Sequence, residues 1–192
     1  MIKNADVPVL DTERLSLTLP PPEAAPQLLR YFEENREHLA PWSPRPPDGF
    51  YTEIYWRDRL RQARAEFEQD KSMQLVIFER ARLEGRVVGV CNFTVFVRSA
   101  YQACYLGYSI GARDEGSGLM REALERAIKY IFDELRLHRI MANYVPTNER
   151  SGRLLRRLGF TVEGYARDYL MINGEWRDHV LTSLVNPHFQ FG

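Results

Sequence analysis

A glycine-rich turn that leads straight into an apolar-striped segment carries the most evident chemistry in this sequence. In Ala112–Leu124, ARDEGSGLMREAL, Arg113 precedes Gly116 and Gly118, which flank Ser117. Glycine lets a backbone come close to a ligand, and the free N–H groups and positive dipole end of a helix N-terminus attract anions. The turn is therefore predicted to hold a phosphate group.

Two nucleotide-binding motifs do not fit this turn. Gly111 and Gly116 have the glycine spacing of a Walker A loop, but its lysine position is Ser117 and its hydroxyl position is Gly118. A G-x-G-x-x-G motif that began at Gly116 would need a glycine where the chain has Arg121. The remaining pattern, R-x-x-G-x-G, is either a pyrophosphate cradle or a strand-to-helix turn that needs glycine only for its geometry.

A second predicted helix start lies about thirty residues further on, in YVPTNERSGRLLRRLGF. Asn148 is a good N-cap residue. Ser151 precedes Leu154 and Leu155 by three and four residues, so its hydroxyl shares their apolar helix face. A hydroxyl at that place needs a partner, which is either its own helix backbone or a ligand in the neighbouring cleft.

The periodicity of the apolar residues predicts the elements that would position both turns. Strands are expected at Arg14–Leu19, Met73–Phe78, Gly85–Val97, Tyr101–Gly111, Arg139–Val145, Thr161–Ile172 and Glu175–Leu184. Helices are expected at 20–39, 51–69, Ser117–Leu135 and Asn148–Leu158, with a proline-rich loop at Ala40–Phe50. Asn173 and Gly174 predict a hairpin turn between the last two strands. This order is that of a mixed α+β sheet, not of a repeating βαβ fold.

Composition narrows the class of protein. The 192 residues suit one domain, and the 26 basic side chains are balanced by 26 acidic ones. Such balance argues against a general nucleic-acid or membrane-surface binder. Cys91 and Cys104 have neither CxxC nor metal-ligand spacing with the histidines, so both are expected to be reduced and buried, with no metal site. With no signal-peptide pattern and no apolar run of about 20 residues, a cytoplasmic protein is expected, with no membrane partner.

Together these features resemble the GNAT superfamily of acetyl-CoA-dependent N-acetyltransferases, and in particular its RimJ-type ribosomal-protein alanine N-acetyltransferases. The words that carry the resemblance are CYLGYSIG, GSGLMREAL, HRIMANYVPTNERSGRLLRRLGF and EGYARDYLMINGEWRDHVLT. The resemblance implies one acetyltransferase domain over residues 1–192, with its core at about 14–186. It also implies an α+β fold: a mixed, mostly antiparallel sheet of about seven strands, flanked by about four helices, with a V-shaped splay between the fourth and fifth strands.

The resemblance assigns roles to individual residues. The coenzyme A pyrophosphate would lie on the first turn, the pantetheine arm would run along the preceding strand, and the second helix start would face the arm and sulfur. The implied cofactor-binding residues are Tyr108, Ser109, Ile110, Arg113, Glu115, Gly116, Ser117, Gly118, Leu119, Asn148 and Ser151.

The catalytic residues are less directly implied, because one position departs from the family pattern. Many relatives place a proton-donating tyrosine seven residues after the helix-start asparagine, where this chain has Leu155. By resemblance to the ribosomal subgroup, Ser151 is expected to be the acid that protonates the thiolate. Glu163 is expected to be the base, because it alternates with Val162 on the strand after Phe160 and can point into the cleft. Glu163 as an ordinary exposed strand residue stays open. Trp42, Asn92 and Tyr105 are expected to contact the substrate, with a structural role as the alternative.

The expected reaction is direct attack of an amine on acetyl-CoA in a ternary complex. A protein α-amine titrates about 2.5 pH units below a lysine, so its neutral form is cheaper by about 3.4 kcal/mol. This favours an N-terminal acceptor, and the resemblance implies the N-terminal alanine of a ribosomal protein, the fifth of the small subunit. A small-molecule amine acceptor, or an acetyl-CoA-binding ribosome assembly factor with weak catalysis, stays open. The oligomeric state, monomer or dimer, also stays open. A basic helix face predicts either solvation or contact with coenzyme A, the ribosome or its RNA: Arg150, Arg153, Arg156 and Arg157.

Overall fold

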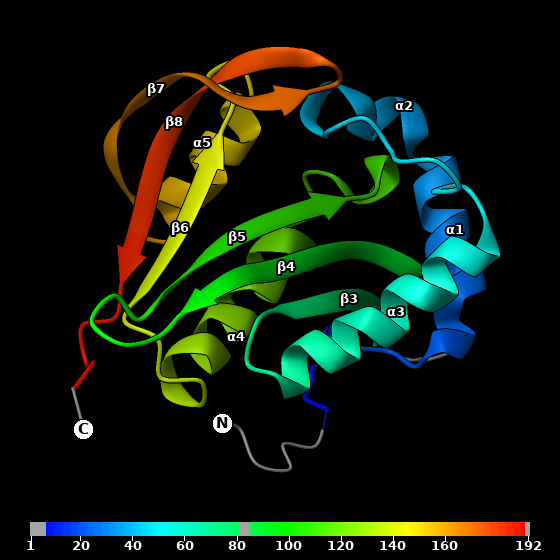
Figure 1. Cartoon of the computed structure of the whole chain (residues 1–192), viewed down its shortest axis with the longest axis horizontal. Coiled ribbons are helices and arrows are strands. Elements are labelled where there is room, and N and C mark those ends of the chain that lie inside the picture. Colours follow the sequence, from blue (N-terminus) through cyan, green and yellow to red (C-terminus); the bar gives the residue numbers. More distant parts are fainter. Residues whose placement is uncertain (1–6, 81–84, 191–192) are drawn as a thin grey trace.

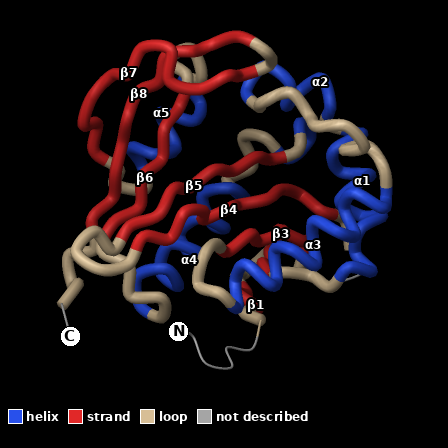
Figure 2. Tube along the Cα trace, in the orientation of Figure 1, coloured by secondary structure: helices blue, strands red, loops and turns tan. Residues whose placement is uncertain are grey.

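The computed structural model describes residues 7–80 and 85–190, which form an eight-stranded mixed sheet with helices on both faces (Figure 1 and Figure 2). The strand order is β1-β2-β3-β4-β5-β6-β8-β7. The strands are β1 (Val9–Asp11), β2 (Leu15–Thr18), β3 (Met73–Glu79), β4 (Val87–Val97), β5 (Ala103–Ile110), β6 (Arg139–Tyr144), β7 (Thr161–Ile172) and β8 (Glu175–Val185).

Helices divide between the two faces of the sheet, so strands β3 and β4 are buried on both sides (Figure 1). On one face, α1 (Ala25–Glu34) and α3 (Glu53–Glu68) pack over Val76 and Val90, with α2 (Arg36–Leu39) beyond them. On the other, α4 (Leu119–Asp133) and α5 (Glu149–Arg157) pack over Ile77 and Cys91. Short 3₁₀ turns lie at Pro22–Ala24, Ala40–Trp42 and Ala112–Asp114. We call the two surfaces the α1–α3 face and the α4–α5 face.

The sheet opens between β5 and β6, its parallel pair. The ladder joins only Ala103 with Arg139, Cys104 with Ile140 and Tyr105 with Met141. Beyond these pairs, β5 stays with β4 as far as Ile110, while β6 stays with β8 as far as Tyr144. The two halves of the sheet therefore diverge as a V, which confirms the splay expected between the fourth and fifth predicted strands.

Most element predictions are confirmed, with three local differences. An eighth strand, β1, pairs with β2 ahead of the expected first strand. The expected helix over 20–39 is interrupted at Asn35, whose backbone (φ −109°, ψ 13°) leaves the helical region between α1 and α2. The helix predicted from Ser117 begins only at Leu119, because Gly118 has a left-handed backbone. The predicted Asn-Gly hairpin turn is present, with positive φ at both Asn173 and Gly174.

Candidate active site

The glycine turn lies at the open end of β5, where the strand ends and α4 begins. Gly116 and Gly118 have φ of +79° and +82°, a left-handed conformation that L-residues rarely adopt. A Cβ at Gly116 would meet no atom within 4 Å, so the backbone here is exposed to open space. The two glycines therefore bend the chain into a shallow loop with accessible backbone.

Free amides make this loop an anion cradle. Within the described chain, no hydrogen bond uses the backbone amide of Gly116 or Gly118. The first-turn amides of α4 add to them, with the positive end of the helix dipole, although the Leu119 amide also donates to Ser117 Oγ at 3.4 Å. Arg113 is exposed, and no ion pair joins it to another described residue. These features are compatible with a bound pyrophosphate.

Three side chains that the sequence reading missed hold the loop in place. Asn35 Oδ1 accepts a hydrogen bond from the Ala112 amide at 2.8 Å. Arg86 pairs with the buried Asp114, with Nη2 to Oδ1 at 2.8 Å. Arg14 Nη1 donates to the Ser117 carbonyl at 3.2 Å. All three partners are distant in sequence, so no local pattern could have indicated them.

The helix start at Asn148 has the predicted cap. Asn148 Oδ1 accepts a hydrogen bond from the Ser151 amide at 3.1 Å. Gly152 allows α5 to pack closely, because a Cβ there would lie 2.8 Å from the Tyr144 ring. Leu155, where many relatives carry a tyrosine, is 1% exposed within the core. The tyrosine's place is thus filled by packing, and no proton donor stands there.

The Ser151 hydroxyl is bonded across the splay and not to its own helix. Its Oγ lies 2.8 Å from the Tyr108 hydroxyl, which comes from β5. Burial raises the pKa of Tyr108 to about 12, so the phenol stays protonated at neutral pH. One residue on, the Ser109 hydroxyl is 3.0 Å from that of Tyr31 on α1, and burial raises the pKa of that phenol as well. Two of the predicted cofactor residues, Tyr108 and Ser151, are thereby brought into contact.

An ion pair joins the glycine-rich loop to α5. Glu115 forms an ion pair with Arg150, one of the four arginines of the predicted basic face. Arg153 pairs with Glu149 on its own helix, while Arg156 and Arg157 are exposed. Ion pairing therefore already engages half of that face.

Glu163 lies on the α1–α3 face, near the point where the V opens. Its carboxylate pairs with Arg139, which shares this face with Tyr105 and Met141 by strand alternation. Hydrogen bonds from Arg139 and Ser183 hold the pKa of Glu163 below its usual range, so it is ionised at neutral pH. Its side chain is 44% exposed, which leaves it accessible to solvent.

Tyr105 belongs to a hydrogen-bonded group at the same place. The hydroxyl of Tyr169, from β7, accepts a hydrogen bond from Asn143 Nδ2 at 3.1 Å. Burial raises the pKa of Tyr105, and its interaction with Tyr169 adds to the effect. Side chains of β5, β6 and β7 therefore meet where the ladder between β5 and β6 ends.

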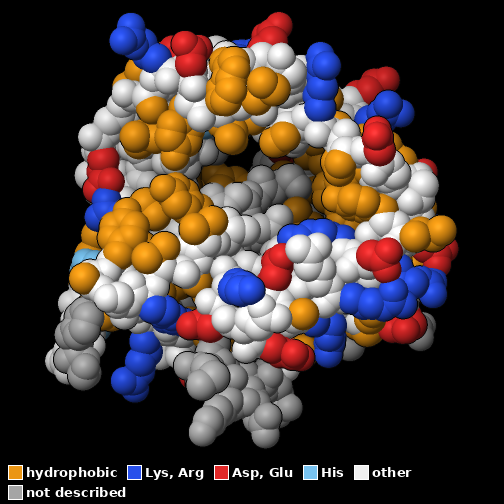
Figure 3. All heavy atoms as spheres, in the orientation of Figure 1, with side chains coloured by type: hydrophobic (Ala, Val, Ile, Leu, Met, Phe, Trp, Pro, Cys, Tyr) orange, Lys and Arg blue, Asp and Glu red, His pale blue; other side chains and the backbone are white. Residues whose placement is uncertain are grey.

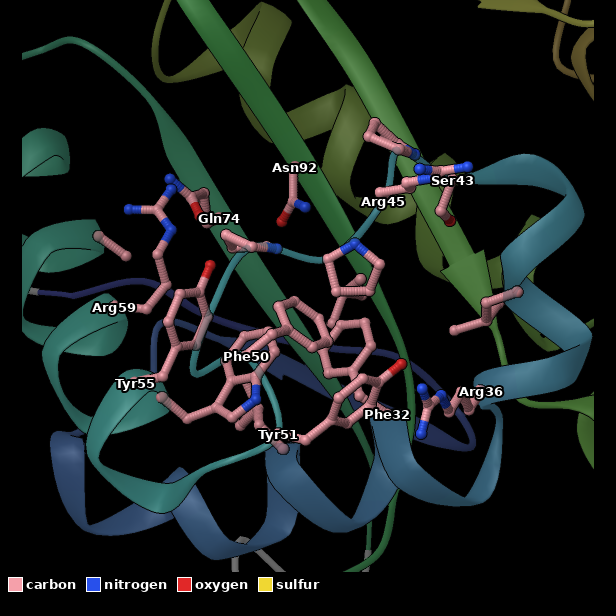
Figure 4. Close-up of a pocket in the computed structure, with 18 of the residues that line it drawn as sticks. Phe32, Arg36, Ser43, Arg45, Phe50, Tyr51, Tyr55, Arg59, Gln74 and Asn92 are labelled. Carbon is pink, nitrogen blue, oxygen red and sulfur yellow. The ribbon is translucent and has the colours of Figure 1, made fainter. Parts of the chain in front are cut away.

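A cavity of about 580 Å³ opens on the α1–α3 face (Figure 4). Figure 3 shows this side of the molecule hollowed between the β7–β8 hairpin and the helices, with hydrophobic side chains around it. Asn92, one of the three residues predicted to contact the substrate, lines the cavity. The proline-rich loop forms one wall through Ser43 to Pro47, whereas Trp42 is not among the lining residues and is 40% exposed.

Within residues 7–80 and 85–190, no group of three metal-ligating side chains comes together. Cys91 and Cys104 are free and buried, as expected. No helix of this part of the chain is long and apolar enough to cross a membrane.

The arrangement can bring two ligands together from opposite sides. The first ligand would have its anionic end at the N-terminus of α4, and its extended arm would lie along the edge of β5 that no longer pairs with β6. A nucleophile, the second ligand, would approach from the α1–α3 face. Extended backbone that is free of ladder partners binds amide-bearing chains by added strand-like hydrogen bonds.

Comparison with known proteins agrees with this geometry. Residues 14–161 match the family model described as an acetyltransferase (GNAT) domain. The chain is 45% identical over 183 residues to the [ribosomal protein uS5]-alanine N-acetyltransferase of Escherichia coli, covering 95% of this chain and 93% of that protein. It therefore belongs to the GNAT family and is an acetyl-CoA-dependent N-acetyltransferase.

Two solved structures also superpose on the chain over nearly its whole length. The ribosomal-protein-S5-alanine acetyltransferase of Vibrio fischeri superposes with a TM-score of 0.90 at 35% identity, over 96% of this chain and 100% of that one. RimJ of Mycobacterium smegmatis, in complex with CoA-disulfide, superposes with a TM-score of 0.84 at 25% identity, over 97% and 90%.

Proposed function

We propose that the protein acetylates the α-amine of a ribosomal protein with an N-terminal alanine, of the uS5 type, in the cytoplasm. The observation that carries the proposal is the near full-length similarity to the E. coli enzyme that acts on this substrate. The amine attacks the thioester directly, with donor and acceptor bound together. Close alignment of two bound reactants lowers the entropic part of such a barrier.

The donor is gripped by backbone more than by side chains. The amides of Gly116, Gly118 and Leu119 bind the pyrophosphate, with Ser117 and Arg113 beside them. The edge of β5 that no longer pairs with β6, from Tyr108 to Ile110, hydrogen-bonds the pantetheine arm, and Asn148 holds the first turn of α5 against it. Support comes from the free amides of the loop and from the end of the β5–β6 ladder at Tyr105.

Ser151 acts as the acid toward the leaving thiolate. Its hydroxyl donates to the sulfur while Oγ accepts a hydrogen bond from the Tyr108 phenol. The 2.8 Å contact between the two hydroxyls supports this pairing, as does the raised pKa that keeps Tyr108 protonated. A chain of two hydroxyls delivers a proton more readily than one, because each bond polarises the next.

Glu163 acts as the base toward the acceptor amine, directly or through one water. Its carboxylate is ionised at neutral pH, and Arg139 lowers its pKa further below its usual range. Tyr105 and Asn92 orient the acceptor from the same face, with Trp42 at the rim. An α-amine needs only a modest base, since it titrates near pH 8, at about 7.7 to 8.0.

The test is intact-mass spectrometry of small-subunit ribosomal proteins, purified without N-terminal acetylation and incubated with enzyme and acetyl-CoA. We expect one protein to gain a single acetyl group on its N-terminal alanine. A parallel reaction contains spermidine and free amino acids. Turnover of small amines alone would overturn the proposal, as would stoichiometric acetyl-CoA binding without any transfer. Intact ribosomes as substrate test whether Arg156 and Arg157 contribute a ribosome contact.

A further inference from the structure

The cavity on the α1–α3 face has a positive lining although the chain as a whole is neutral. Arg36, Arg45 and Arg59 line it, from α2, the proline-rich loop and α3 (Figure 4). No aspartate or glutamate is among the described residues that line it. Glu66 on α3 forms an ion pair with Arg59 from outside the lining, whereas no ion pair joins Arg36 or Arg45 to another described residue, so these two arginines are a local excess of positive charge. A ligand for this cavity is therefore anionic.

Two buried donors of the lining lack acceptors in the described chain. Trp56 is 7% exposed, and its Nε1 has no hydrogen-bond partner. Nη1 of Arg59 likewise makes no hydrogen bond, although it forms an ion pair with Glu66 Oε1 at 3.6 Å. Buried donors of this kind are nearly always paired in folded proteins. Both are donors, so the missing partner is a ligand that supplies acceptor oxygens.

The walls between these polar groups are aromatic. Phe32 stacks on Trp56 with ring centroids 4.5 Å apart, and Phe50 meets the same indole edge-on at 4.9 Å. Such walls exclude water, which strengthens charge interactions at the arginines. The cavity therefore suits a short apolar stem that ends in a carboxylate.

The cavity begins one strand away from the splay. Asn92, in its lining, pairs with Gly107 on β5, two residues past the last β5–β6 pair at Tyr105. A Cβ at Gly107 would meet nothing within 4 Å, so the space beside this residue, between the splay and the cavity, is open. Neighbouring strands are about 4.8 Å apart, and Gln74 on β3 is one strand further. An extended peptide advances about 3.3 Å per residue, so the cavity meets residues two to four behind an amine in the splay.

We propose that this cavity is an acceptor subsite that recognises a carboxylate side chain at one of residues two to four of the acceptor polypeptide. The inference rests on the proposed function, since it names the chemistry that the acceptor carries next to its N-terminal amine. Arg59 and Arg45 bind the carboxylate, and the Trp56 indole donates to a peptide or carboxylate oxygen. The same charge repels polyamine acceptors.

Binding measured without acetyl-CoA tests the subsite apart from catalysis. Isothermal titration compares alanine-first peptides that carry glutamate or lysine at residue two, three or four. We expect one glutamate peptide to bind about 10-fold or more tightly than its lysine counterpart, because opposite charge is matched in a partly desolvated site. Equal affinities at all three positions would overturn the proposal.

Charge reversal identifies the arginines. Arg59→Glu should remove or invert the preference. Arg61→Glu, on the same helix but outside the cavity and 59% exposed, should leave it unchanged. Arg45→Glu, in an exposed loop, repeats the test without the Glu66 contact in case Arg59→Glu melts early. An undiminished preference in Arg45→Glu, and in folded Arg59→Glu, rejects the assignment.

Release of coenzyme A with the same peptides separates this inference from the proposed function. Selective binding without acetyl transfer to any peptide would reject the function and leave the subsite standing. Transfer to glutamate and lysine peptides with equal KM and equal affinity would reject the subsite and leave the function standing.

Discussion

Ser151 and Tyr108 share one hydrogen bond across the splay, so removal of either hydroxyl should slow the same step. In Ser151→Ala the leaving thiolate loses its proton donor. We expect kcat to fall about 100-fold, within the usual contribution of a general acid, and KM for acetyl-CoA to change little. Tyr108→Phe should cost less, because the Ser151 hydroxyl still reaches the sulfur. Steady-state release of coenzyme A measures both parameters.

A serine outside the proposed site, more deeply buried than Ser151, provides the control. Ser72 is 4% exposed and donates to Glu66 Oε2 at 2.8 Å, away from the splay. Ser72→Ala should lower the melting temperature without lowering kcat. If Ser151→Ala kept the wild-type kcat, the thiolate would be leaving unprotonated or taking its proton from water, and the assignment of the acid would be wrong.

Glu163 makes a prediction that depends on pH. A glutamate carboxylate is ionised throughout the neutral range, and the Arg139 contact lowers its pKa further, so the acceptor amine alone sets the acid limb of kcat/KM. Glu163→Gln should reduce kcat/KM about 50-fold at pH 7, where most of the amine still carries its proton. The deficit should shrink towards pH 9, because an amine that titrates at about 8 then needs no base.

Arg139→Gln separates the base from its ion pair. Loss of the arginine lets the pKa of Glu163 rise toward its ordinary value, which is still well below 7, so activity at neutral pH should be retained. Rate profiles from pH 6 to pH 9.5 for the wild type and both variants provide the measurement. A Glu163→Gln profile parallel to that of the wild type would mean that another group or bulk water takes the proton.

Among the elements, the turn between β5 and α4 depends on the left-handed backbone of its two glycines and on side chains that are distant in sequence. Gly116→Ala and Gly118→Ala would force alanine into a left-handed backbone, which costs about 1–2 kcal/mol and favours a rearranged loop. We expect KM for acetyl-CoA to rise about 10-fold while kcat at saturation changes little. Initial rates over a range of acetyl-CoA concentrations provide the test.

Gly159 is the matched control for that prediction. It has φ of +88° at the end of α5, away from the loop, and a Cβ there would be 3.5 Å from Leu184. Gly159→Ala should lower the melting temperature by a similar strain and leave KM for acetyl-CoA unchanged. A similar rise in KM in Gly159→Ala would show that general destabilisation, not the cradle, controls donor binding.

What the sequence could predict at this scale depended on how local each signal was. Alternating apolar residues and the Asn173-Gly174 turn indicated β7 and β8 with nearly correct bounds, because both signals lie within the segment that folds. The cap at Asn148 was equally local. β1 was missed because a strand of three residues has too short a pattern to stand out.

The candidate site was predicted less completely, for the same physical reason. Asn35 caps the Ala112 amide across 77 positions of chain, and Arg86 reaches Asp114 across 28. The cavity has walls from α1–α3, the proline-rich loop and two strands, which only the tertiary fold brings together. No residue spacing in the sequence shows that these elements lie together. Trp42 was therefore predicted to contact the substrate, whereas its neighbours Ser43 to Pro47 line the cavity.

At the scale of the whole molecule, the two buried thiols tie stability to pH. Burial raises the pKa of both Cys91 and Cys104 to about 12, whereas thiols of an unfolded chain titrate at about 8.5. Below about pH 8.5 both thiols are protonated in the folded and in the unfolded state, so they do not change the free energy of unfolding. Above it, the unfolded chain releases protons that the folded protein retains, so the stabilisation is lost as pH rises toward 12.

The free energy of unfolding should therefore fall with pH above about 9, by about 1.4 kcal/mol per pH unit for each thiol. Urea unfolding at pH 7.5, 9, 10 and 10.5 under reducing conditions measures the slope. The double variant Cys91→Ala/Cys104→Ala starts less stable at every pH, because two cavities are left in the core. Its decline should nonetheless be shallower, since the cavity cost is independent of pH and the thiol contribution is gone. Parallel declines in the two proteins would assign the alkaline loss to the buried tyrosines, Tyr31 and Tyr108, whose pKa values burial also raises.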